Sequence, residues 1–313
     1  MKKFTLSLIL FSLLFLAYDK GFLIIADLSA KAEIDKRLED LINGMINKDV
    51  IIVGSSTGSR DIIAGQLEAA TDLSVFNLCY PGSNVEFHEF IVRTLAEFNR
   101  PPELLILAVD DEKELLADPT TTFRNDRMYP LVKYKYIRNE LVNRGEKDWL
   151  FSRFLILHQL NKSNFDLRKK KFTPLDTILN CGSMPISWQR EGREWIYENE
   201  EKPYQRQNEL PEKVLAFKRI IETCELNNIR ILVVFPPVFK KHSLSFERRI
   251  RQLAGNKTYY YVYDTDNPIY SQMKYYYDET HLLQKGAGVF TDEISVYIDS
   301  IKEDIFTMSR ENK

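Results

Sequence analysis

Hydrophobic residues first gather at the N-terminus of the chain. Met1-Lys2-Lys3 is followed by an uncharged, apolar run from Phe4 to Tyr18, and after Asp19-Lys20 a second apolar stretch extends to Ala26. The run lacks the polar stripe with which a core helix of a soluble domain faces solvent. A positive start followed by such a run is typical of a secretory signal or of a membrane helix.

Two fates of this segment differ in whether it is removed. Signal cleavage requires small residues soon after the apolar run, and the best match, Ala30-Lys31-Ala32, lies far downstream. Lys2 and Lys3 favour a cytoplasmic N-terminus. We therefore expect residues 1–29 to form an uncleaved, single-pass anchor in the inner (cytoplasmic) membrane, with the rest of the chain outside the cytoplasm. The alternative is a secreted or periplasmic protein that is freed by signal cleavage.

Beyond the anchor the pattern becomes amphipathic and then alternates between strands and helices. Apolar residues at helical spacing predict a linker helix over residues 30–48. Short, fully apolar runs further along predict strands that are buried on both faces. The expected strands are residues 50–53, 73–78, 104–109, 229–235 and 259–263, and the expected helices are residues 61–70, 84–98, 212–227 and 285–305. This alternation predicts a parallel sheet covered by helices on both faces.

The alternation is interrupted in the middle of the chain. Residues 112–210 contain many aromatic and charged side chains without a clear period. We expect a long insertion of short helices and loops packed over one edge of the sheet, because no linker or second core pattern is visible. The chain is thus predicted to hold one α/β domain, residues 49–306, with this insertion and a membrane anchor.

Composition excludes several classes of protein. Lys+Arg 43 against Asp+Glu 45 leaves a net charge of -2, whereas nucleic-acid binders usually carry a basic excess. The 3 cysteines form no C-x-x-C pair, and no His-rich ligand set is present, so we expect neither metal nor cofactor. A dinucleotide fingerprint is absent because Gly54 and Gly58 have the wrong spacing for G-x-G-x-x-G.

Candidate chemistry lies at the carboxyl ends of the predicted strands, where open α/β sheets bind their ligands. Ser56 follows the first strand, and Asp278 and His281 precede the last helix. A serine hydroxyl becomes a good nucleophile when a positioned base takes its proton, and His281 is the candidate base. Asp278 is placed to hold the imidazole tautomer. Taken alone, a serine after a buried strand is more often a helix N-cap than a nucleophile, and Asp278 with His281 is compatible with a helix cap beside a loop histidine.

The second and third strands end in residues that can complete such a site. Gly82 and Asn84 follow the second strand, and Asp110 follows the third. Backbone N–H groups of Ser56 and Gly82 are candidates to face a developing oxyanion.

The order and spacing of these blocks resemble the SGNH/GDSL hydrolase family. Gly54-Ser55-Ser56 stands for the family's first block, Gly82 for the second, Ala108-Val109-Asp110-Asp111 for the third, and Asp278 with His281 for the last. The resemblance implies a three-layer α/β/α, flavodoxin-like fold, with Ser56 as nucleophile. The Gly-Ser-Ser variant, the anchor and the ending DETHLLQKGAGVF look like the membrane-anchored branch, which includes proteins that work beside membrane-bound O-acyltransferases.

The third block departs from the family pattern, which has an asparagine where this chain has Asp110. An ionised carboxylate accepts hydrogen bonds only and repels an oxyanion. Three interpretations stay open: Asn84 substitutes as the donor, Asp110 is protonated, or Asp110 anchors a loop.

Two functions are compatible with these residues. The first is a membrane-anchored, extracytoplasmic serine esterase or O-acyltransferase that acts on acyl esters, O-acetyl esters above all, of a glycan or cell-envelope polymer. The alternative is a catalytically weak accessory protein that binds a polysaccharide or a membrane acyltransferase. The expected partners are the acylated glycan or another acyl ester, the membrane and a membrane-bound O-acyltransferase, and no nucleic acid.

Overall fold

The chain forms two compact units in a computed structural model, which describes residues 2–168, 171–189, 192 and 194–306. The first unit consists of Met1–Glu39 and Arg124–Phe172, and the second of Asp40–Phe123 and Thr173–Lys313. The central part of the insertion expected at residues 112–210 belongs to the first unit, together with the N-terminal segment.

The second unit is built on a parallel sheet of five strands in the order β2-β1-β3-β4-β5. The strands are β1 (Val50–Val53), β2 (Val75–Asn77), β3 (Leu104–Ala108), β4 (Arg230–Phe235) and β5 (Tyr259–Val262). β1 and β3 are buried along their whole lengths, as their continuous apolar sequences predict. All five expected strands are thus present, and an α/β fold with a parallel sheet is confirmed.

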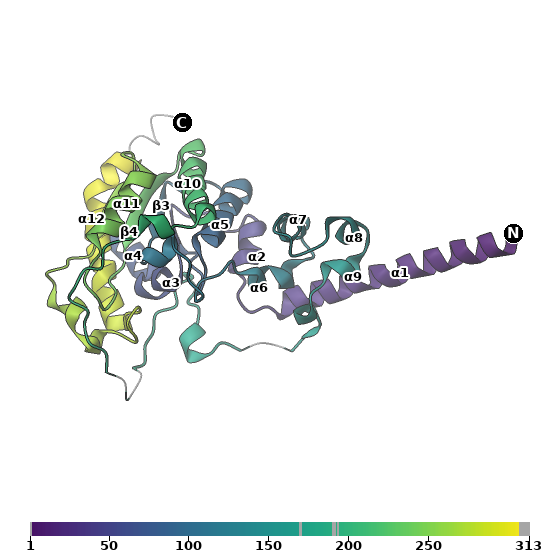
Figure 1. Ribbon diagram of the computed structural model, residues 1–313, viewed down its shortest axis with the longest axis horizontal. Coiled ribbons are helices and arrows are strands. Elements are labelled where there is room, and N and C mark those ends of the chain that lie inside the picture. The colour runs from purple at the N-terminus through teal and green to yellow at the C-terminus, as the bar shows by residue number, and fades with distance from the viewer. Residues whose placement is uncertain (1, 169–170, 190–191, 193, 307–313) are drawn as a thin grey trace. The chain divides into compact units, whose positions relative to one another are not determined.

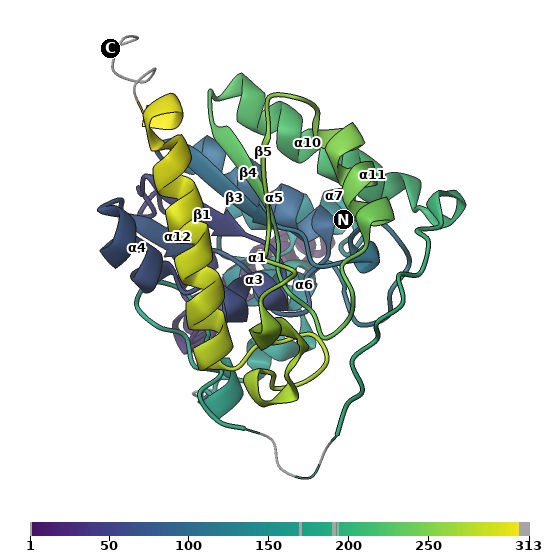
Figure 2. The same cartoon turned by 90° about the vertical axis from the view of Figure 1, so that its left-hand side faces the viewer.

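Helices cover both faces of this sheet. In Figure 2, α4 and α12 lie on one side of the strands and α5 and α10 on the other. The long helices are α4 (Ala64–Thr71), α5 (Val85–Phe98), α10 (Pro211–Leu226), α11 (Leu244–Ala254) and α12 (Gln284–Phe306). Alternate residues of β1 point to opposite faces, so Val50 and Ile52 join the core beneath α12, where Phe290 and Ile294 are fully buried.

One expected helix of this unit begins later than predicted, and another helix precedes it. The pattern predicts a helix over residues 61–70, whereas α3 (Ser56–Asp61) ends before an extended backbone at Ile62 and Ile63, and α4 begins at Ala64. The break is stabilised from outside the segment, since Ile63 N donates to the Thr291 hydroxyl at 3.0 Å and Ala64 N to the Ser183 hydroxyl at 2.9 Å. The sequence pattern missed α11 as well. Short 3₁₀ helices complete the unit: η1 (Glu112–Glu114), η4 (Pro174–Asp176), η5 (Arg206–Asn208), η6 (Pro268–Ser271) and η7 (Met273–Tyr275).

The first unit contains the N-terminal helix, α1 (Lys2–Ala32). This helix is long and apolar enough to cross a membrane, and 6% of its most apolar window is buried. In Figure 1 it is the long purple helix. Its length and hydropathy fit either a membrane anchor or a signal sequence.

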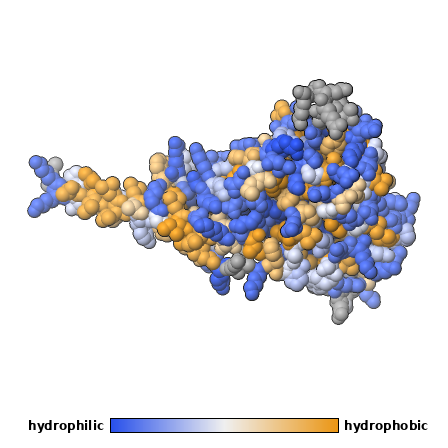
Figure 3. All heavy atoms as spheres, turned by 180° about the vertical axis from the view of Figure 1, so that it is seen from behind, coloured by the Kyte–Doolittle hydropathy of each residue, from blue (hydrophilic) through white to orange (hydrophobic). Residues whose placement is uncertain are grey.

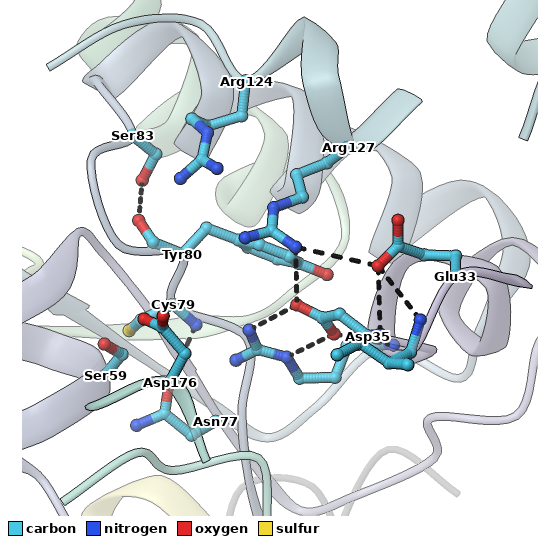
Figure 4. Close-up of polar contacts among 12 residues, drawn as sticks. Glu33, Asp35, Ser59, Asn77, Cys79, Tyr80, Ser83, Arg124, Arg127 and Asp176 are labelled. Atoms are coloured by element: carbon cyan, nitrogen blue, oxygen red, sulfur yellow. Dashed lines mark hydrogen bonds and ion pairs between the residues drawn. The ribbon is translucent and has the colours of Figure 1, made fainter. Parts of the chain in front are cut away.

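The expected linker helix over residues 30–48 is replaced by the end of α1, a turn and the short α2 (Arg37–Ile42). Acidic side chains form the turn: Glu33 accepts from the backbone N–H groups of Ile34 and Asp35, and Asp35 accepts from that of Arg37. Figure 4 shows Arg127 reaching toward both acids, and its nitrogen lies 3.9 Å from Glu33 and 3.8 Å from Asp35. These local acceptors compete with helix hydrogen bonds and end α1.

Six short elements between Arg124 and Phe172 complete the first unit. They are α6 (Asn125–Met128), η2 (Tyr129–Leu131), α7 (Lys135–Asn143), α8 (Trp149–Phe154), α9 (Ile156–Gln159) and η3 (Lys162–Phe165). Several of them pack along the C-terminal half of α1, where Asn164 donates to the Ser29 hydroxyl at 2.9 Å.

Candidate active site

Ser56 begins α3 directly beyond the carboxyl end of β1. The chain passes close to β3 on both sides of this residue. A Cβ added at Gly54 would lie 2.8 Å from the carbonyl oxygen of Ala108, and one added at Gly58 would lie 2.7 Å from Cys79 Sγ. Side chains do not fit at such distances, so the two glycines allow α3 to start against the sheet. This local packing fixes the position of Ser56.

Ser56, His281 and Asp278 form one chain of hydrogen bonds. His281 Nε2 lies 2.8 Å from Ser56 Oγ, and His281 Nδ1 lies 2.8 and 2.9 Å from the two carboxylate oxygens of Asp278. With Asp278 accepting from Nδ1–H, Nε2 is left to accept the serine proton. The structure therefore brings together the three residues that the sequence singled out, although Ser56 and His281 lie 225 positions apart.

Asp278 is held as a carboxylate. Burial acts to raise its pKa, but the hydrogen bond and charge of His281, with two further donors on Thr280, outweigh burial and lower the pKa to about 2. The Thr280 backbone N–H and hydroxyl each lie 3.0 Å from Asp278 Oδ1. Asp278 therefore stays ionised at neutral pH and can stabilise a positive imidazolium.

Asp110 clamps the two residues that flank Ser56. The hydroxyls of Ser55 and Thr57 donate to its two carboxylate oxygens. Burial and then the charge of Glu114 raise the pKa of Asp110 to about 7, although the two hydroxyl donors lower it. The expected place of Asp110 in an oxyanion hole does not fit this geometry, because both carboxylate oxygens serve the nucleophile loop. Loop anchoring, one of the three open interpretations, describes its contacts.

The expected role of Asn84 as a substitute donor does not fit the structure either. Its side-chain oxygen accepts from Phe87 N at 3.1 Å and caps α5, while its amide nitrogen donates to Glu86 at 3.2 Å. Asparagine is a preferred N-cap residue, and the cap engages its side-chain oxygen while the nitrogen is directed toward Glu86.

Gly82 remains the candidate for the oxyanion hole beside the nucleophile. Its φ of 73° is in the left-handed region that glycine tolerates best. Together with Ser56 and His281 it lines a cavity of about 360 Å³. Within the described ranges, the backbone N–H groups of Gly82 and Ser56 have no acceptor in the protein, so both are available to a ligand oxygen.

A second serine–histidine–acid chain lies beneath the Gly82 loop, and no motif in the sequence predicts it. His88 Nε2 lies 2.9 Å from the Ser83 hydroxyl, and His88 Nδ1 lies 3.0 Å from Glu114. All three residues are buried, with exposed fractions of 1%, 1% and 4% for Ser83, His88 and Glu114. A substrate cannot reach this serine. The chain instead ties the loop that carries Gly82 to α5 and η1.

Charged residues also line the cavity. Arg60, one turn after Ser56, has a buried side chain, and the pKa of its guanidinium is lowered by burial. Its nearest acid is Asp176 at 3.9 Å, and its buried Nε has no partner in the part of the chain that is described. Asp111 is paired with Lys240 at 3.0 Å. Arg60 was not foreseen, although its spacing of four from Ser56 places both on one helix face.

Two further observations concern possible metal ligands and the similarity of the sequence to known proteins. Among the described residues, no three or more His, Cys, Asp or Glu side chains are grouped so that they could hold a metal ion. No protein-family model matches the sequence, and no curated protein matches it either.

Proposed function

We propose that the protein is a membrane-anchored serine esterase or O-acyltransferase of the SGNH type. The observation that carries this proposal is the continuous series of hydrogen bonds from Ser56 through His281 to Asp278. The distances from Ser56 Oγ to His281 Nε2 and from His281 Nδ1 to Asp278 Oδ1 are both 2.8 Å. A nucleophile, a base and an orienting acid at hydrogen-bond distance are the requirements for acyl transfer through serine. The strand order 2-1-3-4-5, which is that of flavodoxin-like sheets, supports the fold that the resemblance implies.

Acylation begins when Ser56 Oγ attacks the carbonyl carbon of an ester. His281 Nε2 takes the serine proton as the bond forms, and Asp278 stabilises the resulting imidazolium. The carbonyl oxygen becomes an oxyanion that the Ser56 and Gly82 N–H groups are placed to receive. When the tetrahedral intermediate collapses, the C–O bond to the alcohol breaks and His281 returns the proton to the departing oxygen. An acyl group remains on Ser56.

Deacylation repeats the sequence with a second nucleophile. His281 takes a proton from water or from an acceptor hydroxyl, whose oxygen attacks the acyl carbon. The bond between that carbon and Ser56 Oγ then breaks, and His281 returns the proton to Ser56 Oγ. Water gives hydrolysis, and a glycan hydroxyl gives transfer. Two backbone donors without an asparagine amide form a weaker oxyanion hole, since one lost donor typically reduces turnover on the order of 100–1,000-fold.

The substrate that we propose is a short acyl ester, O-acetyl above all, on a glycan or another cell-envelope polymer. A cavity of about 360 Å³ is at the lower end of the range for small-molecule sites and suits a short acyl group. The polymer and a membrane-bound O-acyltransferase as partner rest on the family resemblance. In this proposal α1 is the anchor in the cytoplasmic membrane and the catalytic unit lies outside the cytoplasm.

Covalent labelling tests the proposal directly. A fluorophosphonate should label the full-length protein, the Ser56→Ala variant should not react, and Ser300→Ala on the exposed face of α12 should label as the wild type does. Turnover of short p-nitrophenyl esters should follow the same pattern. A wild-type protein that neither labels nor turns over esters, with Ser56→Ala fully functional in cells, would instead favour the accessory protein that binds a polymer or an acyltransferase.

A further inference from the structure

The first unit carries a cluster of exposed apolar side chains on two short helices. Trp149, Leu150, Phe151 and Phe154 of α8 and Leu157 of α9 are between 44% and 63% exposed. A surface of this kind in a folded protein marks contact with another apolar phase or molecule. We call these five residues the α8–α9 apolar face.

Two of the three buried residues of the same helices are polar, which departs from the usual pattern. Ser152 and Gln159 are each 6% exposed, beside the apolar Ile156 at 7%, and the Gln159 side-chain nitrogen donates to the Ser152 carbonyl oxygen at 2.7 Å. Asp148 caps α8 by accepting from the N–H groups of Leu150 and Phe151. The fold thus satisfies the polar groups internally and turns apolar side chains outward, as a protein does in lipid.

These helices are attached to the middle of α1 rather than to its end. Asp19 of α1 is 2% exposed, and its two oxygens accept from Ile156 N at 2.8 Å and Leu157 N at 3.0 Å, at the start of α9. Nearby, the rings of Phe22 and Phe165 meet edge to face with centroids 6.4 Å apart. Figure 1 shows α9 against the side of α1, and in Figure 3 the exposed part of α1 is almost continuously apolar.

The depth of Asp19 along α1 decides what surrounds the α8–α9 apolar face. From Phe4 to Asp19 the helix rises about 22 Å, at about 1.5 Å per residue. The hydrocarbon core of a bilayer is about 30 Å thick, so a membrane that begins at Phe4 extends about 8 Å past Asp19 along an untilted helix. Interfacial helices insert their apolar faces by about 5–10 Å. The depth of about 8 Å at Asp19 therefore lies within the range of depths to which interfacial helices insert.

We propose that the α8–α9 apolar face is immersed in the outer edge of the same bilayer that α1 spans. The proposal rests on α1 being the membrane anchor, as stated under Proposed function. It explains how a carboxylate is placed on a membrane helix: Asp19 meets two backbone N–H groups where it would otherwise face lipid. It also explains why Trp and Phe dominate the face, since aromatic rings favour the membrane interface.

Charges around the face fit a lipid surface better than a protein partner. Arg153, Lys162, Arg168 and Lys171 are all exposed in this part of the unit, as is Lys20 on α1. Long basic side chains reach from the interface toward lipid phosphates. The exposed acids nearby are already engaged: Asp166 is paired with Arg168 at 2.8 Å, and Asp148 caps α8.

Tryptophan fluorescence in vesicles tests this proposal. The full chain with Trp188→Phe and Trp195→Phe retains Trp149 as its single tryptophan, and it is reconstituted into vesicles whose acyl chains carry bromine either near the glycerol or near the chain end. For a ring about 5–10 Å below the surface, we expect roughly a twofold loss of emission with the shallow bromines, a smaller loss with the deep ones, and protection from aqueous acrylamide. As a second measurement, Trp149→Phe alone should remove the bromine-sensitive part of the wild-type emission.

The outcomes separate this proposal from the anchor itself. Protein that fails to float with the vesicles overturns both. If the protein floats but Trp149 is quenched by acrylamide and not by bromine, the immersed face is overturned and the anchor stands. Protection of Trp149 from both quenchers overturns it as well, in favour of a protein partner or a second copy on this face.

Discussion

Asp110 is the residue whose replacement tests the site most sharply, because its charge and its hydrogen bonds have separate effects. In Asp110→Asn the side-chain oxygen still accepts from one of the Ser55 and Thr57 hydroxyls. The amide nitrogen can donate to the other, which rotates to accept. The clamp on the nucleophile loop therefore survives, while the titrating carboxyl group is gone.

The expected size of the effect follows from the pKa of Asp110, which is raised from 3.8 to about 7 in the folded protein. The folded state therefore holds its proton more tightly than the unfolded chain. Between about pH 4 and pH 7 the unfolded chain releases that proton first, so the free energy of unfolding falls as the pH rises. A shift of about 3 pKa units corresponds to about 4 kcal/mol. This loss is complete above the folded pKa and absent below pH 4.

Unfolding of both proteins in detergent, followed from pH 4 to pH 8, measures this effect. The stability of Asp110→Asn relative to the wild type should increase by about 4 kcal/mol across the range, or about 10 °C in Tm. Asp110→Ala should show the same trend from a lower starting point, because it leaves two hydroxyls without their acceptor. Parallel curves for Asp110→Asn and the wild type would refute the assignment of a raised pKa to Asp110.

Three further variants address the site and the first unit. Asp278→Asn should lower kcat for ester hydrolysis on the order of 10⁴-fold with an unchanged Tm, since the imidazole loses its orienting acceptor; equal kcat values would contradict the triad. Gly58→Ala should cost about 1–3 kcal/mol of stability and slow fluorophosphonate labelling, because its Cβ would meet Cys79 Sγ at 2.7 Å. Asp19→Ala should speed amide hydrogen exchange at Ile156 and Leu157 in vesicles, as their two backbone N–H groups lose their acceptor, and an unchanged exchange rate would count against this cap.

The sequence predicted the sheet and the triad because both depend on signals that the chain carries locally. Strands that are buried on both faces of a parallel sheet require unbroken apolar runs such as Val50-Ile51-Ile52-Val53. Such runs can be read directly from the sequence. The acid and the base lie three positions apart in one loop, so their contact needs little beyond that loop. Ser56 could be placed because strand ends of a parallel sheet meet at one edge.

Other features depend on contacts that no local pattern records. Asp110 accepts from hydroxyls more than fifty positions earlier in the sequence. The hydrogen bonds from Ser83 through His88 to Glu114 form only when η1 lies against α5. Asn84 is different: its preference for the N-cap of the following helix was readable from the sequence. The first unit was missed because its short elements are held to α1 by contacts between residues far apart in the sequence, such as that of Asp19 with Ile156 N.

The distance along the chain between Ser56 and His281 has a consequence for synthesis. At about 5–20 residues per second, the 225 positions between them take about 11–45 s to translate. Throughout that interval His281, the hydrogen-bond partner of Ser56, is not yet present. In the function that we propose, the emerging polypeptide therefore cannot react with esters until the segment just before α12 has folded onto the sheet. If α1 also directs the chain through a membrane, the site is completed only after most of the protein has left the ribosome.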